Sequence, residues 1–196
     1  MSKILSLTLA RSITSALEIP TSLSASSESL PDLSPIINKL QSLTPSPGLD
    51  QAFHLLKEQD ISAKILIITN GAKATTEGYV KQAGLERFVD GVQSCDEVGF
   101  GKPFGQVYDA ATRICDELGR GRERWFVAAH MWDVCAARKA GFKTGIVVAE
   151  QPPTGEGLDS WWELWGGKPD VVGMDLAEVV RGILGIVPSL VEATRF

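Results

Sequence analysis

The sequence predicts an α/β protein with a Rossmann-like, three-layer parallel sheet. Two observations support this fold class. Short apolar runs rich in β-branched residues recur along the chain, and amphipathic stretches of helical length lie between them. The connections are short, so each strand–helix–strand unit should be right-handed, with parallel strands buried on both faces. We therefore expect an α/β core over residues 46–196 and a separate helical part over residues 1–45.

The helical part is predicted from two amphipathic segments. Apolar residues share one face of a helix over Ile4–Ile19, although Lys3–Leu9 also alternates in a way that suits a strand. A serine-rich loop follows, and Leu33–Leu43 has the pattern of a second helix. The prolines and glycine of Pro45–Gly48 then mark the boundary with the core.

Within the core, helices and strands are predicted in the alternating order that a parallel sheet requires. The predicted strands are Lys64–Ile68, Trp125–Ala129, Thr144–Val148 and the weaker Asp170–Gly173. The predicted helices are Leu49–Gln59, Ala74–Ala83, Tyr108–Leu118, Ala136–Ala140 and Leu176–Leu184. Ligands of such sheets bind at the carboxyl ends of the strands, so the residues that follow each strand are the first candidates for a site.

Composition and charge exclude several classes of protein. The 19 Lys+Arg and 24 Asp+Glu give a net charge of −5 over 196 residues, so a nucleic-acid partner is not expected. No apolar run approaches the ~18–20 residues that span a bilayer, so no membrane partner is expected, and no signal peptide is apparent. Three cysteines without a CxxC pair indicate neither a disulfide framework nor a zinc site. A cytoplasmic location fits best.

The first candidate motif, Thr69-Asn70-Gly71, directly follows a predicted strand. A hydroxyl, a carboxamide and free backbone N–H groups at a strand tip can bind an anion. The same three residues are also typical of a turn that leads into a helix N-cap. Taken alone, the triplet supports both interpretations.

The second motif, Gly101-Lys102-Pro103, follows a glycine-rich stretch, and Tyr108 comes shortly after it. Proline stiffens the backbone, so Lys102 is held at a defined place where it can neutralise a carboxylate or a phosphate. The alternative is a surface lysine in a loop. The motif is not a Walker loop, because the glycine spacing and the following Ser or Thr are absent.

The third motif places His130 and Asp133 after the strand that ends at Ala129. These two side chains can orient each other or a substrate, and the small Ala128 and Ala129 allow a ligand to approach the backbone. Alternatively, Asp133 caps a helix and His130 is a polar residue near the core.

The order of these motifs is more specific than any one of them. A strand with Thr-Asn-Gly, then Gly-Lys-Pro about thirty residues later, then a strand with Ala-Ala-His-x-Trp-Asp, and then Ala-Gly-Phe-Lys-Thr before a strand resembles the haloacid dehalogenase (HAD) superfamily. The pattern is most similar to the 2-haloacid dehalogenase type II branch in its fungal form. This resemblance covers about Leu33–Val148 closely. It implies an HAD-like core and identifies residues 1–45 as part of the branch's helical cap.

The resemblance also implies a role for each motif. Thr69 and Asn70 would bind the substrate carboxylate or the acyl intermediate. Lys102 would offset the negative charge of nucleophile and substrate as a catalytic residue. Asp133, the second catalytic residue, would orient Lys102 and help to activate the hydrolytic water.

Two further substrate-binding residues follow from the resemblance. Tyr108 is similar to the active-site tyrosine of the branch. Bacterial members carry Ser and Asn where this chain has Ala128 and His130, so the resemblance does not determine the substrate range. His130 is itself able to polarise a water molecule. No metal ligands are expected among these residues.

The superfamily's nucleophile is an aspartate at the end of the first strand, and the sequence has no match to its motif. The first acidic residue is Glu18, and no Asp occurs before Asp32. If Ile4–Ile19 is a cap helix, the chain lacks that central strand, and a gap is expected between the strands that precede Asn70 and His130. An alternative alignment of Lys3–Leu9 with the strand would place Thr8 at the nucleophile position. In both cases the covalent mechanism is expected to be absent from this chain.

The resemblance implies hydrolytic dehalogenation of a small 2-halocarboxylate without a cofactor, impaired in this chain. One alternative is a non-catalytic pseudoenzyme that binds a carboxylate or another small anion. The other is an HAD phosphatase truncated by an incomplete gene model, which would need Mg²⁺. The aromatic segment Leu158–Trp165 is expected to pack on one edge of the core or to cover a subunit contact, so a homodimer is an expected assembly.

Overall fold

The computed structural model describes residues 35, 39, 44–58, 63–148 and 157–186. The chain divides into two compact units, Met1–Thr44 and Pro45–Phe196, and every element described below belongs to the second. The helix predicted over Ile4–Ile19 and the alternative strand Lys3–Leu9 lie outside the described residues, as does most of the helix predicted over Leu33–Leu43. The assignment of residues 1–45 to a cap therefore stays a prediction.

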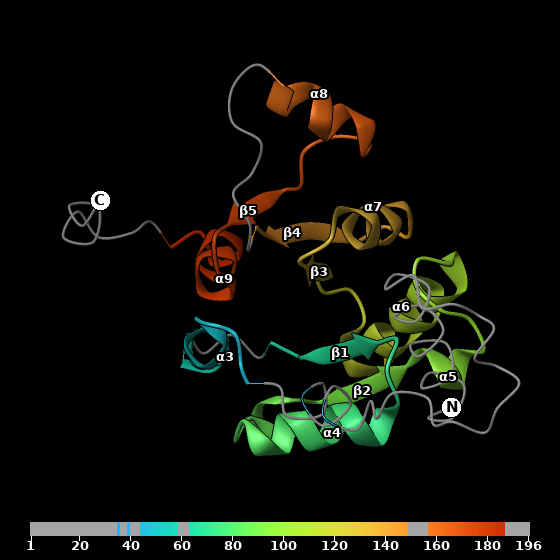
Figure 1. Ribbon diagram of the computed structural model, residues 1–196, viewed down its shortest axis with the longest axis vertical. Helices are drawn as coiled ribbons and strands as arrows, with labels where there is room; N and C mark the ends of the chain where they lie inside the picture. Colours follow the sequence, from blue (N-terminus) through green and yellow to red (C-terminus); the bar gives the residue numbers. More distant parts are fainter. Residues whose placement is uncertain (1–34, 36–38, 40–43, 59–62, 149–156, 187–196) are drawn as a thin grey trace, which may run out of the picture. The chain divides into compact units, whose positions relative to one another are not determined.

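The second unit alternates helices and strands (Figure 1). In chain order they are α3 (Leu49–Glu58), β1 (Leu66–Thr69), α4 (Lys73–Gln82), the 3₁₀ helix η2 (Glu86–Phe88), β2 (Gly91–Ser94), α5 (Cys95–Val98), α6 (Gly105–Gly119), β3 (Trp125–Ala128), α7 (Met131–Lys139), β4 (Lys143–Val147), α8 (Gly157–Leu164), β5 (Val171–Gly173) and α9 (Leu176–Leu184). All described strand pairs are parallel, which confirms the predicted α/β class. Within the described ranges, no helix has the length and hydropathy needed to cross a bilayer.

The described strands form two parallel sheets instead of one continuous sheet. One sheet pairs β1 with β2, and the other has the order β3-β4-β5. Figure 1 shows β1 and β2 drawn apart from β3, β4 and β5. The division lies between β1, which ends at Thr69, and β3, which ends at Ala128. This is the position at which a gap was predicted.

Strand β2 was not predicted, because its sequence lacks the apolar pattern of a buried strand. Residues 91–94 read Gly-Val-Gln-Ser, and only one of them is a strong strand former. The pairing partner β1 determines the conformation here, with Ile67 opposite Val92 and Ile68 opposite Gln93. Gln93 is buried and its side-chain amide donates to the carbonyl of Val107 at 3.0 Å.

The five helices predicted in the core are present, and three of them begin earlier than the periodicity indicated. Helix α4 begins at Lys73, α6 at Gly105 and α7 at Met131, before their predicted starts at Ala74, Tyr108 and Ala136. Helix α4 ends at Gln82, one residue before the predicted end at Ala83, and Gly84 follows the cap with φ +70°, a conformation that favours glycine. Helix α9 has the predicted bounds, Leu176–Leu184.

Helices from both sides bury the strands. Helix α7 packs on β3 and β4, α9 packs on β4 and β5, and α4 packs on β2. The largest apolar contacts next to the candidate site are edge-to-face aromatic pairs, with ring centroids 5.5 Å apart for Tyr108 and Phe126 and 5.9 Å apart for Phe126 and Phe142. Trp162 of the aromatic segment is buried against Met131 and Ile146, so α8 packs on the core.

Candidate active site

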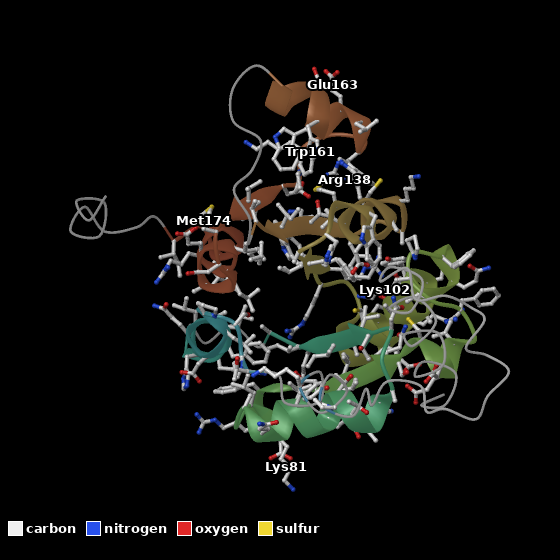
Figure 2. All side chains as sticks on the ribbon, viewed as in Figure 1. Lys81, Lys102, Arg138, Trp161, Glu163 and Met174 are labelled. Atoms are coloured by element: carbon white, nitrogen blue, oxygen red, sulfur yellow. The ribbon has the colours of Figure 1, made fainter. Side chains whose placement is uncertain are left out.

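The sequence-predicted site residues lie where β1 and β3 end. Thr69 is the last residue of β1, and Asn70 follows it. His130 precedes α7 after the end of β3, and Asp133 lies in the first turn of α7. The loop that carries Lys102 bridges these two strand ends through the hydrogen bonds described next. Figure 2 labels the Lys102 side chain at this junction.

Lys102 and Asp133 form a largely buried ion pair. The Nζ atom lies 2.9 Å from Oδ2, and the two side chains are 11% and 7% exposed. The ammonium group also lies 5.3 Å from the centroid of the Phe126 ring. Little water surrounds this pair, so its charges interact more strongly than they would on the surface. The pair thus fixes the position of one cationic group at the strand ends.

Tyr108 holds the other oxygen of the same carboxylate. Its side chain is fully buried, and its hydroxyl donates a hydrogen bond to Oδ1 of Asp133. Burial raises the pKa of Tyr108 far above its usual value, and the neighbouring Asp133 carboxylate raises it further. The hydroxyl therefore remains a donor. With Lys102 on one oxygen and Tyr108 on the other, the carboxylate of Asp133 has a fixed orientation.

Asn70 joins the end of β1 to the lysine loop. Its Oδ1 atom accepts the backbone N–H of Lys102 at 2.8 Å. The next peptide bond, between Lys102 and Pro103, is cis. Because Lys102 contacts Asn70 through its backbone and Asp133 through its side chain, this one residue connects the two strand ends.

Thr69 takes part in the turn that sequence reasoning kept as an alternative. Its hydroxyl oxygen accepts the backbone N–H of Gly71 at 3.0 Å, and the carbonyl of Gly71 accepts the hydroxyl of Ser94 at 2.8 Å. The helix-cap interpretation is wrong, because the N-cap of α4 is Ala72. The exposed side chain of Asn70 and the partly exposed Thr69 remain at the strand end.

His130 contacts the group of Lys102, Asp133 and Tyr108 through its backbone carbonyl, which accepts the N–H of Asp133 at 3.1 Å. It is exposed and occupies the N-cap position of α7, but its side chain makes no capping hydrogen bond. Its ring lies beside Trp132, with centroids 5.6 Å apart. The interpretation of Asp133 as the helix cap is therefore wrong: His130 holds that position, and the Asp133 side chain faces the lysine.

Sequence reasoning missed two residues at the end of β2. Ser94 caps α5 and contacts the turn after β1, and Cys95 is buried close to Lys102 and Asp133. Burial raises the pKa of the Cys95 thiol. Both were overlooked because β2 itself was not predicted. Strand-end position, the signal that identified the other motifs, would have identified them.

The arrangement can bind a small anion. An ammonium group has three donors, and Asp133 accepts one of them, so two N–H groups of Lys102 remain for a ligand. The amide nitrogen of Asn70 adds a neutral donor nearby. In the described part of the chain, no group of three or more His, Cys, Asp or Glu side chains is placed so that it could hold a metal ion.

Comparison with known proteins identifies relatives of this site and fold. Residues 21–141 match the family model of the haloacid dehalogenase-like hydrolases. The chain is 32% identical over 96 residues to (S)-2-haloacid dehalogenase 4A of Burkholderia cepacia, covering 48% of this chain and 40% of the relative. It is 32% identical over 103 residues to (S)-2-haloacid dehalogenase of Pseudomonas sp. strain YL, covering 52% and 42%.

A third relative has a different activity. Pyrimidine 5'-nucleotidase YjjG of Escherichia coli is 30% identical over 119 residues, which cover 61% of this chain and 52% of that protein. The matched region thus spans about half or less of the length of each of these curated relatives.

Solved structures show the same fold. L-2-haloacid dehalogenase RSc1362 superposes with a TM-score of 0.66 at 22% identity, covering 89% of this chain and 68% of that chain. L-2-haloacid dehalogenase PA0810 gives a TM-score of 0.61 at 25% identity with the same coverage. The expected resemblance to the 2-haloacid dehalogenase branch is confirmed by these relatives and structures.

Proposed function

The chain belongs to the haloacid dehalogenase-like hydrolases, and from this membership we propose that its function is that of a 2-haloacid dehalogenase. In this reaction the carbon–halogen bond of a small 2-halocarboxylate breaks, an oxygen from water becomes the new hydroxyl, and halide and a proton are released. The relatives named (S)-2-haloacid dehalogenase support the proposal. The observation that carries it is the buried Lys102–Asp133 pair held by Tyr108 at the strand ends.

In this proposal Lys102 binds the substrate carboxylate and offsets the charge that develops during the reaction. Its ammonium group is fixed by Asp133 before the substrate arrives, so little reorganisation is needed. Asn70 positions the Lys102 backbone and offers its amide N–H groups to the same substrate. Thr69, at the end of β1, and His130, before α7, would contact the ligand from the two sheets.

The first chemical step, attack by a carboxylate on carbon, is not assigned to Asp133. Both of its oxygens already accept hydrogen bonds, one from Lys102 and one from Tyr108. Its role in the proposal is to orient Lys102 and to help to activate the hydrolytic water. We therefore propose that this chain alone binds 2-halocarboxylates but releases halide slowly or not at all.

A phosphatase is the second candidate, favoured by the 30% identity to the nucleotidase YjjG. Such an activity would need Mg²⁺. The described residues do not fit this ion, because they provide no group of three acidic or other metal-binding side chains.

The experiment incubates the purified chain with (S)-2-chloropropionate and measures chloride, 2-hydroxypropionate and the midpoint of thermal unfolding. The expected result is a higher midpoint with the (S) than with the (R) enantiomer and slow chloride release. Brisk release would contradict the proposed impairment and support the dehalogenase function. Hydrolysis of p-nitrophenyl phosphate that depends on Mg²⁺, without any effect of 2-chloropropionate, would favour the phosphatase.

We also propose a cytoplasmic location and a homodimer. Cys95, Cys115 and Cys135 are all free thiols, as in a reducing compartment. Leu164 at the end of α8 is 78% exposed and offers an apolar contact for a second copy. Cell fractionation tests the location. Sedimentation velocity tests the dimer, and a monomer at every concentration measured would contradict it.

A further inference from the structure

The turn between β1 and α4 exposes an asparagine that is followed by a glycine, Asn70-Gly71. Strand β1 ends at Thr69 and α4 begins at Lys73, so the pair belongs to neither element. The backbone nitrogen of a residue that follows asparagine can attack the side-chain amide carbon, and this makes asparagine chemically labile. Glycine hinders the attack least, because it has no side chain. The pair therefore has the arrangement that deamidation requires.

The side-chain amide of Asn70 is held at its oxygen. Its Oδ1 atom accepts the backbone N–H of Lys102 at 2.8 Å. A donor at this oxygen stabilises the negative charge that develops there when a nucleophile adds to the amide carbon. In the part of the chain that the structure describes, the amide nitrogen, which must leave, forms no hydrogen bond. The contact with Lys102 therefore favours attack at this carbon.

One contact restrains the reaction. The backbone N–H of Gly71 donates to Oγ1 of Thr69 at 3.0 Å, and this proton must leave the nitrogen before the attack. Release of one hydrogen bond at an exposed turn costs little, because water replaces the lost partner. The restraint therefore slows the attack without preventing it.

A second pair that can form the same cyclic intermediate, Asp90-Gly91, shows how the fold protects such a pair. One oxygen of the Asp90 side chain accepts Nζ of Lys64 at 2.8 Å, and the other accepts the backbone N–H of Ile65 at 2.9 Å. Gly91 is the first residue of β2, and its N–H donates to the carbonyl of Ile65 at 3.3 Å. The asparagine after β1 lies beyond the last paired residues of the two strands and lacks this protection.

We propose that Asn70 is a site of spontaneous deamidation through a succinimide formed with Gly71. Hydroxide or water takes the proton of the Gly71 nitrogen, and this nitrogen forms a bond to Cγ of Asn70. The Cγ–Nδ2 bond breaks, and the side-chain nitrogen takes up a proton and leaves as ammonia. Water then opens the ring at either carbonyl and yields aspartate or isoaspartate. A water molecule is consumed, ammonia is released, and no oxidation or reduction occurs.

The products change the candidate site. Aspartate removes the N–H donors of the amide and adds a carboxylate to a site that already holds Asp133, so a small anion binds less well. Isoaspartate also adds a carbon atom to the backbone between β1 and α4, which displaces the acceptor of the Lys102 N–H. This consequence rests on the proposed function, in which Lys102 binds a carboxylate. The deamidation itself does not depend on that function.

The test incubates the full chain in warm, mildly alkaline buffer and follows it by peptide mapping with mass spectrometry, which separates asparagine, aspartate and isoaspartate. The second asparagine of the chain, Asn38, precedes a lysine and is the internal control. We expect Asn70 to convert at least about tenfold faster than Asn38, and isoaspartate to form at Asn70 before it forms at Asp90. An intact Asn70, or equal conversion of the two asparagines, would overturn the proposal.

Two variants of the turn test the mechanism. Gly71 has no positive φ, so alanine suits its backbone, and the added Cβ would lie 3.3 Å from Oγ1 of Thr69. Gly71→Ala keeps Asn70 and should slow its conversion about tenfold, and thermal unfolding checks that the variant is folded. Thr69→Val removes the acceptor of the Gly71 N–H and should speed conversion about two- to tenfold. An unchanged rate in a folded Gly71→Ala variant would contradict attack by the glycine nitrogen, and an unchanged or slower rate in Thr69→Val would contradict the restraint.

Calorimetric titration with (S)-2-chloropropionate separates the modification from its effect on the site. Incubated wild type should lose binding in proportion to the converted fraction of Asn70, whereas incubated Gly71→Ala should keep the affinity of its fresh sample. Full binding by converted wild type would contradict the effect on the site. If fresh wild type does not bind, the proposed function fails, and the mass measurement still decides whether Asn70 deamidates.

Discussion

The side-chain oxygen of Asn70 accepts the backbone N–H of Lys102 at 2.8 Å, although the two residues belong to different loops. This bond joins the tip of β1 to the loop whose lysine reaches Asp133 on α7. Lys102 therefore links the two parallel sheets at the candidate site.

Replacement of Asn70 should loosen the lysine loop. Asn70→Ala removes the acceptor and should lower the free energy of unfolding by about 1 kcal/mol, with weaker binding of 2-chloropropionate. Asn70→Asp keeps an oxygen acceptor for the Lys102 N–H and is the matched control for stability. Urea denaturation measures both variants. Equal stability of the Ala and Asp variants would show that this bond does not hold the loop.

Breaking the ion pair should be strongly destabilising. Lys102→Met leaves the buried Asp133 carboxylate without its cation, and a loss of about 3–5 kcal/mol in the free energy of unfolding is expected. The double variant Lys102→Met/Asp133→Leu removes both charges and should recover most of the loss. Chemical denaturation of the single and double variants checks this. A single-variant cost below about 1 kcal/mol would contradict the burial of the pair.

The hydroxyl of Tyr108 should contribute to stability in a pH-dependent way. Tyr108→Phe should cost about 1.5–3 kcal/mol at pH 7, because the lost bond is to a carboxylate. The pKa of Tyr108 is raised in the folded state, so this contribution is complete below the unfolded pKa of about 10 and is lost at higher pH. The stability difference between wild type and Tyr108→Phe should therefore shrink above pH ~10. Urea denaturation across alkaline pH measures it, and a constant difference would argue against the raised pKa.

Asp170 should contribute stability that is lost in acid. Burial raises its pKa, but hydrogen bonds from the backbone and side chain of Thr144 and the charge of Arg138 outweigh this effect, and the net pKa is lowered. A lowered folded pKa gives stability that is present above the unfolded value of about 3.9 and is lost as the pH falls through the folded pKa. Asp170 is exposed, so solvent screens its charge, and Asp170→Asn should cost only about 0.5–1 kcal/mol at pH 7 and little at pH 2.

The control for Asp170 is Asp109→Asn, on the exposed side of α6. This variant should leave the acid unfolding curve unchanged. Acid titration followed by circular dichroism compares the two. If Asp170→Asn unfolds at the same pH as wild type and has the same stability at pH 7, the hydrogen bonds from Thr144 to Asp170 do not stabilise the folded state.

Sequence reasoning found the elements whose patterns are local and missed those that depend on a neighbour. The apolar runs of β1, β3 and β4 and the periodicity of α3 and α9 are visible in the chain, so these elements were predicted. Strand β2 is not visible, because Gly91, Gln93 and Ser94 form a strand only where β1 offers hydrogen bonds. Without β2, the strand-end position of Cys95 could not be recognised either.

The candidate site shows the same limit. The order of the motifs predicts that Lys102 and Asp133 lie together, and their charged atoms are 2.9 Å apart. The hydrogen bond from Tyr108 to Asp133 and the use of the Thr69 hydroxyl in a turn depend on side-chain directions, which spacing does not reveal. The exposed position of the His130 ring beside Trp132 also depends on a side-chain direction that spacing does not reveal. The functional roles of all these residues stay predictions.

The most direct test of the central claim is a calorimetric titration of the full chain with (S)-2-chloropropionate. The account predicts binding that Lys102→Gln weakens about tenfold or more, since a charge-assisted hydrogen bond is lost. Lys81→Gln, on the exposed end of α4, should bind like wild type. Binding of equal strength in wild type and a folded Lys102→Gln variant, or no binding by wild type, would contradict a carboxylate site built on Lys102.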